Sequence, residues 1–338
     1  SMLFDSHGLG SAQETRQLIN RIEQIRPDIV HLHCVHGYYL NYKILFEYLN
    51  KADIPVVWTF HDFWAITGHC AHFVEANCYK WQSKCHDCPL HKRYPSSFVD
   101  CSTRNYELKK SLFSSCRNLN ITAVSDWVKD CTELSYLGNK AISVIPNGID
   151  LNTFKYRPGL ESLIPKDKGF VMLGVASQWK EGKGFADYLR LSGLLKDDEV
   201  VIVVGLSRQQ ISSLPANIIG IECLSSPIEL AQLYSRADVL LSLSYAETFG
   251  MTIVEAAACG TPSIVYDNTA QKSLVTEETG EVVPTGDVSA VYDALKKMRL
   301  LGKERYAVAC RTRVEKYFNK DERFMDYIRL YEKLLNNK

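Results

Sequence analysis

The chain has 338 residues, and its 39 Lys and Arg residues balance 39 Asp and Glu residues. A net charge of zero argues against nucleic acid as the main partner, and the length suits two α/β domains of roughly 150 residues each. No apolar run approaches the roughly 20 residues that span a bilayer, and no signal peptide is recognisable at the start. We therefore expect a cytoplasmic protein whose eleven cysteines are free thiols or metal ligands.

Helices and strands alternate through the first half, as a doubly wound parallel sheet requires. Apolar residues at helical spacing predict helices, and short apolar runs predict buried strands. The predicted elements are a helix over 11–28, a strand at 29–33, a helix over 39–49, a strand at 54–60, a helix over 105–116, a strand at 121–124, a helix capped by Ser125 and a strand at 141–146. Between Phe63 and Asp100 this rhythm breaks, and so long an insertion is usually functional or stapled by something other than a core.

The second half repeats the alternation more regularly. Five strands are predicted at 170–176, 199–205, 218–222, 238–244 and 262–266, Ser226 and Pro227 cap one of the helices between them, and three helices fill 287–338. Turn and loop residues place the boundary between Asn147 and Lys168. We expect an amino-terminal domain over 1–147 with a Cys-rich insertion at 68–100, a carboxyl-terminal domain over 148–318, and a terminal helix over 319–338 that packs back on the first domain.

The stretch from 246 to 266 combines an apolar strand, a short loop and the start of a helix. It places Glu247 and Glu255 eight residues apart around Gly250. Amides of a first helical turn point outward and the helix dipole attracts anions, while glycine lets a ligand approach the backbone. Gly260 and Pro262 end the helix. The alternative is an ordinary βαβ crossover whose early Glu complements the helix dipole.

This ordered set of residues resembles the acid-seven-acid motif of retaining glycosyltransferases of family 4, including those of bacterial capsular and exopolysaccharide synthesis. PNGID at 146–150, the Lys-Gly pair at 183–184 and the closing helices fall where that family has them, so the resemblance covers nearly the whole chain. It implies the α/β GT-B fold, in which two Rossmann-like domains with parallel sheets face a cleft. Family members begin with a strand and a glycine-rich loop; this chain enters at a later helix, so its amino-terminal domain is expected to be truncated.

The resemblance assigns the nucleotide-sugar donor to the carboxyl-terminal domain. It implies that Glu255 holds the ribose hydroxyls and that Glu247 touches the donor sugar. The amides of Gly250, Met251 and Thr252 would meet sugar hydroxyls and phosphate oxygens. Base contacts in this fold are largely made by backbone and fall near Leu224 to Glu229, so side chains there say little about the base. Uridine diphosphate sugars are favoured over guanosine diphosphate sugars.

Two further groups are implied around the donor. Lys183 would neutralise the departing diphosphate, although a loop lysine beside glycines is ordinarily a solvated turn. Family members commonly have an arginine where this chain has Gln178, so Lys180 would compensate or the leaving group is stabilised differently. His61 would reach the donor sugar from the amino-terminal domain, with Asp62 as a weaker candidate for acceptor binding. Outside the resemblance, His61 is more often a polar cap at a strand end.

The insertion holds the one cysteine cluster, with Cys70, Cys78, Cys85 and Cys88 at spacings of eight, seven and three. The CxxC pair has the spacing of metal ligands, and two further thiolates would complete a tetrahedral structural zinc site. The alternative is four reduced cysteines in a loop packed by Trp81, Phe73 and Tyr79. Zinc is the preferred of the two interpretations.

Together these features predict a retaining hexosyltransferase of bacterial surface polysaccharide synthesis. It would move a sugar from a nucleotide diphosphate to a glycan or polyprenyl-linked acceptor without a catalytic metal. Two alternatives stay open: a nucleotide-sugar epimerase of related fold, and a non-catalytic protein that binds nucleotide sugars. Basic and aromatic residues over 80–110 suggest a peripheral membrane contact at the inner face, although such a mixture is more often a solvated face.

Overall fold

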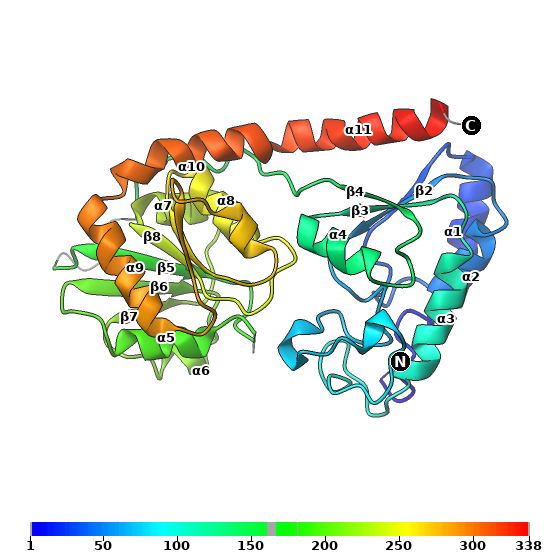
Figure 1. Cartoon of the computed structure of the whole chain (residues 1–338), viewed down its shortest axis with the longest axis horizontal. Helices are drawn as coiled ribbons and strands as arrows, with labels where there is room; N and C mark the ends of the chain where they lie inside the picture. Colours follow the sequence, from blue (N-terminus) through cyan, green and yellow to red (C-terminus); the bar gives the residue numbers. More distant parts are fainter. Residues whose placement is uncertain (1, 161–166, 181, 337–338) are drawn as a thin grey trace. The chain divides into compact units, whose positions relative to one another are not determined.

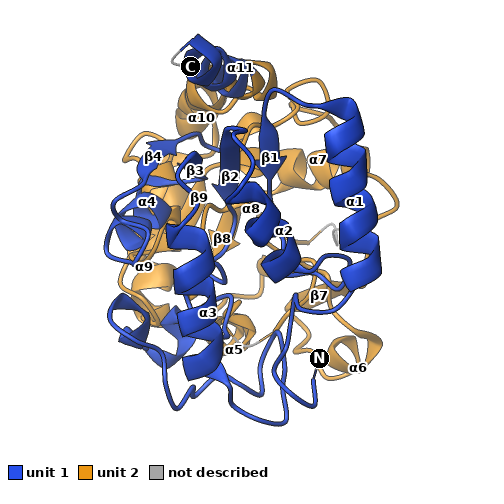
Figure 2. Cartoon of the chain, turned by 90° about the vertical axis from the view of Figure 1, so that its right-hand side faces the viewer, with its two compact units in different colours: residues 1–146, 325–338 blue, residues 147–324 orange. Residues whose placement is uncertain are grey.

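The computed structural model describes residues 2–160, 167–180 and 182–336 and divides into two compact units. Unit 1 runs to Pro146 and takes in the chain again from Met325, whereas unit 2 is Asn147–Phe324 (Figure 2). Residues 161–166 of the predicted linker lie outside the described residues. Figure 1 labels the helices and strands along the chain.

Unit 1 is built on a four-stranded sheet with the order β1-β2-β3-β4, and each neighbouring pair is parallel. The four strands predicted from the sequence are confirmed. Its elements are α1 (Ala12–Ile25), β1 (Val30–Leu32), α2 (Tyr42–Leu49), β2 (Val56–Phe60), α3 (Ser102–Ser114), β3 (Leu119–Ala123), α4 (Asp126–Glu133) and β4 (Ala141–Val144). Every residue of β2 is buried, because a central parallel strand is covered on both faces.

Two helices of unit 1, α2 and α4, begin where a side chain caps the first turn. The predicted cap Ser125 is confirmed, since its hydroxyl accepts a hydrogen bond from the Val128 amide at 3.3 Å. Helix α2 begins at Tyr42, three residues later than predicted, because the Asn41 side chain accepts from the Ile44 amide at 3.1 Å and fixes the start there. The capping residue therefore overrides the tyrosine-rich stretch before it.

The insertion between β2 and α3 has its own small aromatic core, which includes Phe73 and Trp81 as the alternative to the zinc site supposed. It contains two short 3₁₀ helices, Val74–Ala76 and Lys80–Gln82. Phe63, Phe73 and Trp81 are all at most 1% exposed, and the ring centroids of Phe73 lie 4.8 Å from Phe63 and 4.9 Å from Trp81. Large aromatic side chains this well buried stabilise a segment that has no sheet.

Unit 2 contains a six-stranded parallel sheet with the order β10-β9-β8-β5-β6-β7. Its elements are β5 (Phe170–Val175), α5 (Phe185–Ser192), β6 (Glu199–Val204), α6 (Arg208–Ile211), β7 (Ile218–Ile221), α7 (Pro227–Arg236), β8 (Val239–Ser242), α8 (Met251–Ala258), β9 (Ser263–Tyr266), a 3₁₀ helix (Gln271–Leu274), β10 (Gly280–Val283), α9 (Val288–Leu301) and α10 (Glu304–Tyr317). The last helix, α11 (Lys320–Asn336), starts in unit 2, and its residues from Met325 on belong to unit 1.

Strand β10 is the one strand of this sheet that the sequence analysis missed. The strand has four residues, GEVV, and occupies an edge, where it pairs only with β9. Glu281 and Val282 are not buried, so the apolar run typical of a central parallel strand is absent. The other five strands, and the Ser226 and Pro227 start of α7, are confirmed.

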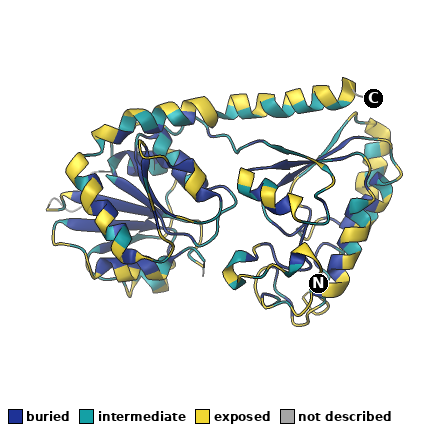
Figure 3. Ribbon diagram, viewed as in Figure 1, coloured by how far each residue is buried: buried dark blue, intermediate teal, exposed yellow. Residues whose placement is uncertain are grey.

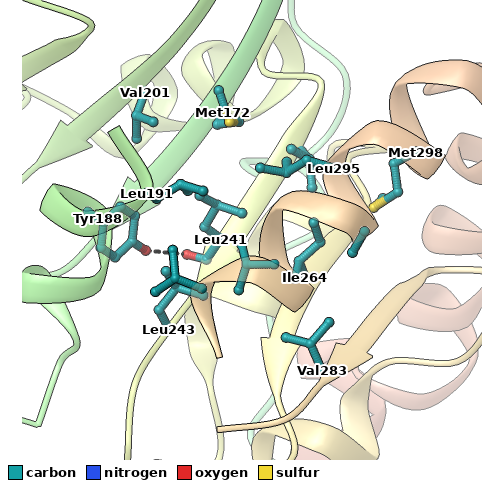
Figure 4. Packing of buried hydrophobic residues seen from close by; sticks show 14 of the residues in the cluster. Met172, Tyr188, Leu191, Val201, Leu241, Leu243, Ile264, Val283, Leu295 and Met298 are labelled. Carbon is teal, nitrogen blue, oxygen red and sulfur yellow. Dashed lines mark hydrogen bonds between the residues drawn. The ribbon is translucent and has the colours of Figure 1, made fainter. Parts of the chain in front are cut away.

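The core of unit 2 lies between its sheet and the flanking helices (Figure 3). Strands β5 and β6 are buried along nearly their whole length. Figure 4 shows Met172, Leu241 and Ile264 packed with Leu191 and Leu295, and each of the five is at most 3% exposed. Burial of each such side chain contributes about 1.5–3 kcal/mol, which gives the loops at the strand ends a rigid base.

Among the residues that the structure describes, no helix has the length and apolar character needed to cross a membrane.

Candidate functional site

A pocket of about 250 Å³ in unit 2 lies where strands β5 and β8 end. These strands are neighbours in the middle of the sheet. Strands β6 and β7 lie beyond β5 on one side, and β9 and β10 lie beyond β8 on the other. Loops diverge at such a switch in strand order, and ligands of open parallel sheets bind there. The lining residues are Asn147, Val175, Ala176, Ser177, Trp179, Lys183, Tyr188, Leu241, Ser242, Leu243, Ser244, Glu247, Thr248, Phe249, Gly250, Met251 and Thr252.

The amino terminus of α8 forms part of the pocket wall. Gly250 caps the helix with φ +115° and ψ 62°, a conformation that glycine adopts without the strain of a side chain. A Cβ atom at this position would lie 3.0 Å from Ile253 Cδ1 and 3.1 Å from Leu274 Cδ1. Met251 and Thr252, the first residues of the helix, also line the pocket, so the positive end of the helix dipole faces the space that an anion would occupy.

Lys183 and Glu247 form an ion pair beside this helix terminus. The Lys183 Nζ donates to Glu247 Oε1 at 2.6 Å, and the two side chains are 39% and 20% exposed. The Glu247 loop is fixed from the other side, because its amide donates to Thr269 Oγ1 at 3.0 Å. The pair arises because Lys183 follows β5, Glu247 follows β8, and these strands are adjacent.

The loop that holds Lys183 fits tightly against the end of β8. Gly184 has φ +74°, and a Cβ atom there would lie 1.9 Å from the carbonyl oxygen of Leu243. The Gly182 carbonyl accepts a hydrogen bond from the Tyr245 amide at 2.7 Å. These contacts hold the lysine backbone at a fixed distance from the Glu247 loop.

Glu255 lies one turn into α8, outside the pocket lining. Its Oε2 accepts a hydrogen bond from the hydroxyl of Tyr234 on α7 at 2.8 Å, and Tyr234 is fully buried. Burial raises the pKa of Glu255, and the tyrosine hydrogen bond opposes this by stabilising the carboxylate.

The remaining donor candidates do not line the pocket. Gln178 is exposed in the loop after β5, and Leu224 is half-buried in the loop between β7 and α7. The pocket wall also includes polar and aromatic residues to which the sequence alone assigned no role, among them Asn147, Trp179 and Ser244. Their signal was positional: Asn147 belongs to PNGID, and the other two lie just beyond the ends of apolar strands.

In unit 1, His61 and Asp62 follow the end of β2, as expected from the sequence. The His61 Nε2 lies 2.9 Å from Nδ1 of His33, and the two rings stack with centroids 5.2 Å apart. Burial and the neighbouring His33 lower the pKa of His61, whereas Asp62 acts in the opposite direction. His33 follows β1, and parallel pairing of β1 with β2 brings the two histidines together.

Asp62 faces back into its own unit. Its Oδ1 accepts from the Trp64 amide at 2.9 Å, and its Oδ2 lies 3.4 Å from Nε2 of His36. His36 is 8% exposed, and its pKa is lowered by burial, against the opposing effect of Asp62. The carboxylate is thus held by local contacts at the end of the strand.

The four cysteines of the insertion are free thiols. Cys70 and Cys88 interact through a side-chain hydrogen bond. Within the described part of the chain, no three His, Cys, Asp or Glu side chains form a metal-binding group as they stand, so the zinc site stays a prediction.

A larger groove, of about 800 Å³, lies at the opposite end of α8 and is lined by residues of α7 and α10 that include Arg236, Lys303 and Arg311. Cationic side chains there are bonded to protein carbonyls: the Lys303 Nζ donates to the Ser235 and Ala237 oxygens at 2.6 Å each. Asp238 and Gly260 place this groove before the starts of β8 and β9, whereas ligands of open parallel sheets bind beyond the carboxyl ends of the strands, so the smaller pocket is the better candidate for an active site.

Two families of known proteins match the chain, one in each half. "Glycosyltransferase Family 4" matches residues 2–153 and "Glycosyl transferases group 1" matches residues 162–313. Two sheets of parallel strands with these matches define a glycosyltransferase of the GT-B fold. The chain belongs to glycosyltransferase family 4, and it is an enzyme of the hexosyltransferase type.

Curated relatives share this assignment. The "Putative colanic acid biosynthesis glycosyl transferase WcaC" of Escherichia coli is 25% identical over 296 residues, which cover 85% of this chain and 71% of the relative. The "Phosphatidyl-myo-inositol mannosyltransferase" of Mycobacterium leprae is 30% identical over 58% of this chain and 54% of its own length. The "O-antigen chain mannosyltransferase RfbU" of Salmonella typhimurium is 28% identical over 52% of this chain and 48% of its own length.

Solved structures agree on the fold. The sucrose-phosphate synthase of Thermosynechococcus elongatus has a TM-score of 0.73 and 18% identity, over 97% of this chain and 79% of that one. HepE of Anabaena, solved in complex with UDP, has a TM-score of 0.68 and 17% identity, over 94% of this chain and 82% of that one. At such identities the likeness concerns the fold alone.

Proposed function

We propose that this chain transfers a hexose from a nucleotide diphosphate to a glycan acceptor with retention of the anomeric configuration. The observation that carries the proposal is the Lys183–Glu247 pair at the amino terminus of α8, inside the pocket at the ends of β5 and β8. A cation, an acid and free helix amides at one place suit a donor that combines a diphosphate with sugar hydroxyls.

The proposed chemistry breaks one bond and forms another at the same carbon. The bond between the anomeric carbon and the diphosphate oxygen breaks, and the acceptor hydroxyl oxygen attacks from the same face. The acceptor proton passes to the departing phosphate oxygen. Lys183 and the amides of Met251 and Thr252 stabilise the charge that develops on the diphosphate, and no metal is invoked for this purpose.

The remaining roles follow the family resemblance. Glu247 contacts the donor sugar, Glu255 holds the ribose hydroxyls, and base contacts fall near Leu224. His61 contacts the sugar, and Asp62 takes part in acceptor binding. These assignments rest on the positions of the motifs along the chain.

We favour uridine diphosphate sugars as donors because the Anabaena HepE structures were solved with UDP and with UDP-glucose. The names of two relatives point to mannose as the sugar instead, since they describe mannosyltransferases. Two relatives are named for colanic acid and O-antigen, which are polysaccharides, and a third is named for phosphatidyl-myo-inositol, which is a lipid. We therefore propose a lipid-linked glycan as acceptor, which would bring the enzyme to the inner face of the membrane.

The test begins with binding. Thermal shifts with UDP-glucose, UDP-galactose and GDP-mannose identify the donor, and calorimetry measures its affinity. Glu255→Ala is expected to abolish donor binding, an effect larger than the loss of stability from the unpaired Tyr234 hydroxyl. Glu278→Ala, which removes an exposed glutamate of the same unit outside the pocket, is the matched control. Intact donor affinity in the Glu255 variant would overturn its assignment.

Product analysis then separates the competing functions. Incubation with donor and lipid-linked glycan is expected to yield a product whose new linkage keeps the donor's anomeric configuration, as read from proton NMR. A changed sugar in the absence of acceptor would identify an epimerase. Nucleotide binding without turnover across the donor panel and acceptors would identify a binding protein.

A further inference from the structure

The cysteine cluster of the insertion takes no part in the proposed transfer. Cys70, Cys78, Cys85 and Cys88 come from three parts of the segment between β2 and α3. Cys70 is 7% exposed and the other three are half-buried. A buried group of free thiols in a segment without a sheet calls for a structural role.

The thiols are gathered around Cys85. Cys70 and Cys88 share a side-chain hydrogen bond, and Cys85 interacts electrostatically with both of them and with Cys78. Four thiolates are one of the usual ligand sets of Zn²⁺ in structural sites. The fold thus brings Cys85 within electrostatic reach of the other three cysteines.

Backbone amides point at two of the sulfur atoms. The Gly68 amide donates to Cys85 Sγ at 3.2 Å, and a backbone hydrogen bond from Leu90 reaches Cys88. Such amides stabilise sulfur as a thiolate, the form that binds metal. Gly68 is required for this approach, because a Cβ atom there would lie 2.2 Å from the Ser102 carbonyl oxygen and 2.8 Å from Cys85 Cβ.

A buried lysine supplies positive charge beside the cluster. Lys109 on α3 is 1% exposed, and its Nζ donates to the carbonyl oxygens of Trp64 at 2.8 Å and Thr67 at 3.1 Å. Burial lowers the pKa of Lys109 to about 7, whereas Cys85, Cys70, Asp5 and Asp62 act in the opposite direction. An ammonium at this depth is costly unless compensated, and a zinc ion with four thiolates carries the net negative charge that would compensate it.

His69, next to Cys70, has an unsatisfied nitrogen. Its Nδ1 lies 2.6 Å from Asp5 Oδ1, the ring is fully buried, and Nε2 has no hydrogen-bond partner. An orphaned buried polar atom costs about 1–3 kcal/mol. His69 is also within electrostatic reach of Cys88.

We propose that Cys70, Cys78, Cys85 and Cys88 bind one Zn²⁺ as thiolates and that the ion ties the insertion together. Each thiol releases its proton to solvent on binding. The side chains do not form a metal-binding group as they stand among the described residues, so binding requires their sulfur atoms to turn toward one another. Four protein ligands leave no open position, so the ion is structural.

The first experiment measures metal in the whole chain, purified without added zinc. Mass spectrometry of the metals is expected to find zinc equimolar with protein, and a mercurial reagent to release it into a colorimetric chelator. Cys85→Ser with Cys88→Ser is expected to lose the zinc. Cys223→Ser, an exposed thiol of unit 2, and Cys34→Ser, an exposed thiol of unit 1, are matched controls that retain it.

The second experiment stays with the unaltered chain, so it does not depend on the folding of a variant. Exchange of zinc for Co²⁺ is expected to produce the intense visible and near-ultraviolet bands of a tetrahedral cobalt thiolate. Metal-free protein whose insertion resists proteolysis, zinc unchanged in the double variant, or a Cys70–Cys88 disulfide found by mapping would each overturn the proposal. No readout uses turnover, so the glycosyltransferase assignment is unaffected by either result.

Discussion

The hydroxyl of Tyr234 donates a hydrogen bond to Oε2 of Glu255 at 2.8 Å, and this contact joins α7 to α8. Tyr234 is fully buried, and its backbone carbonyl is held in turn by the Thr261 hydroxyl. Burial alone would favour the protonated form of Glu255, whereas a hydrogen-bond donor favours the carboxylate. The tyrosine therefore both orients the carboxyl group and preserves the charge that ribose hydroxyls would meet.

Removal of that hydroxyl tests Tyr234 as a positioning residue. Tyr234→Phe is expected to weaken UDP binding about 5- to 10-fold, since one hydrogen bond to a charged group contributes about 1–1.5 kcal/mol. Calorimetry should also show a reduced preference for UDP over its 2′-deoxy analogue. Tyr292→Phe is the matched control, because Tyr292 also contacts a glutamate, Glu199 at 3.3 Å, outside the pocket. A lowered melting temperature with unchanged UDP affinity would reduce Tyr234 to a structural role.

Lys183 should matter for turnover rather than for folding. Lys183→Met keeps the length of the side chain but removes the charge, so kcat is expected to fall on the order of 10²–10³-fold, as when one transition-state donor is lost. Both side chains of the pair are partly solvated, so the melting temperature should move little. Lys272→Met, which breaks an exposed pair with Asp267, is the control. Equal activity of the two variants would contradict the assignment.

Gly184 is expected to be intolerant of a side chain. Gly184→Ala places a Cβ atom 1.9 Å from the Leu243 carbonyl at φ +74°, so the free energy of unfolding should fall by about 2 kcal/mol or more. Urea denaturation measures the loss. Gly193→Ala is the matched control in the same helix, α5, because Gly193 has φ −71° and its nearest contact would be 3.5 Å away. If Gly184→Ala lost no more free energy of unfolding than Gly193→Ala, the Lys183 loop would have adjusted freely to the side chain.

Acid should destabilise unit 1 through His31. Burial, with His33 and His61, lowers the pKa of His31 from 6.5 to about 4, and the ring bonds to Tyr331 and Thr59 at 2.6 and 2.8 Å. His31 takes up a proton near pH 6.5 in the unfolded chain and only near pH 4 in the folded chain. The contribution of the neutral His31 ring to the free energy of unfolding is therefore fully present above pH 6.5 and is lost as the pH falls through this range.

Thermal unfolding at pH 7.5 and pH 5 measures this effect. His31→Gln should reduce the difference in melting temperature between the two conditions without abolishing it, because burial also lowers the pKa of His33 and His61. His86→Gln, at an exposed position of the insertion, should leave the difference unchanged. An undiminished difference in the His31 variant would contradict the assignment.

Most of the fold could be predicted from local patterns. The central strands are continuous apolar runs, and the starts of α4 and α7 carry capping residues that act within one turn. Strand β10 was not predicted, because an edge strand of four residues lacks the continuous apolar run of a central strand. In the insertion, packing by Phe73 and Trp81 was predicted only as an alternative and the part of Phe63 was not predicted, because these residues have no period and meet only through the folding of the loop.

The sequence by itself determined the start of α8 and its two acids, because a strand, a glycine and a helix are adjacent along the chain. Only the tertiary structure decided which side chains they meet. Lys183 reaches Glu247 because β5 and β8 pair across the switch in strand order, and Tyr234 reaches Glu255 because α7 packs on α8. Periodicity reports which face of an element is buried, but the partner across that face depends on strand order and helix packing.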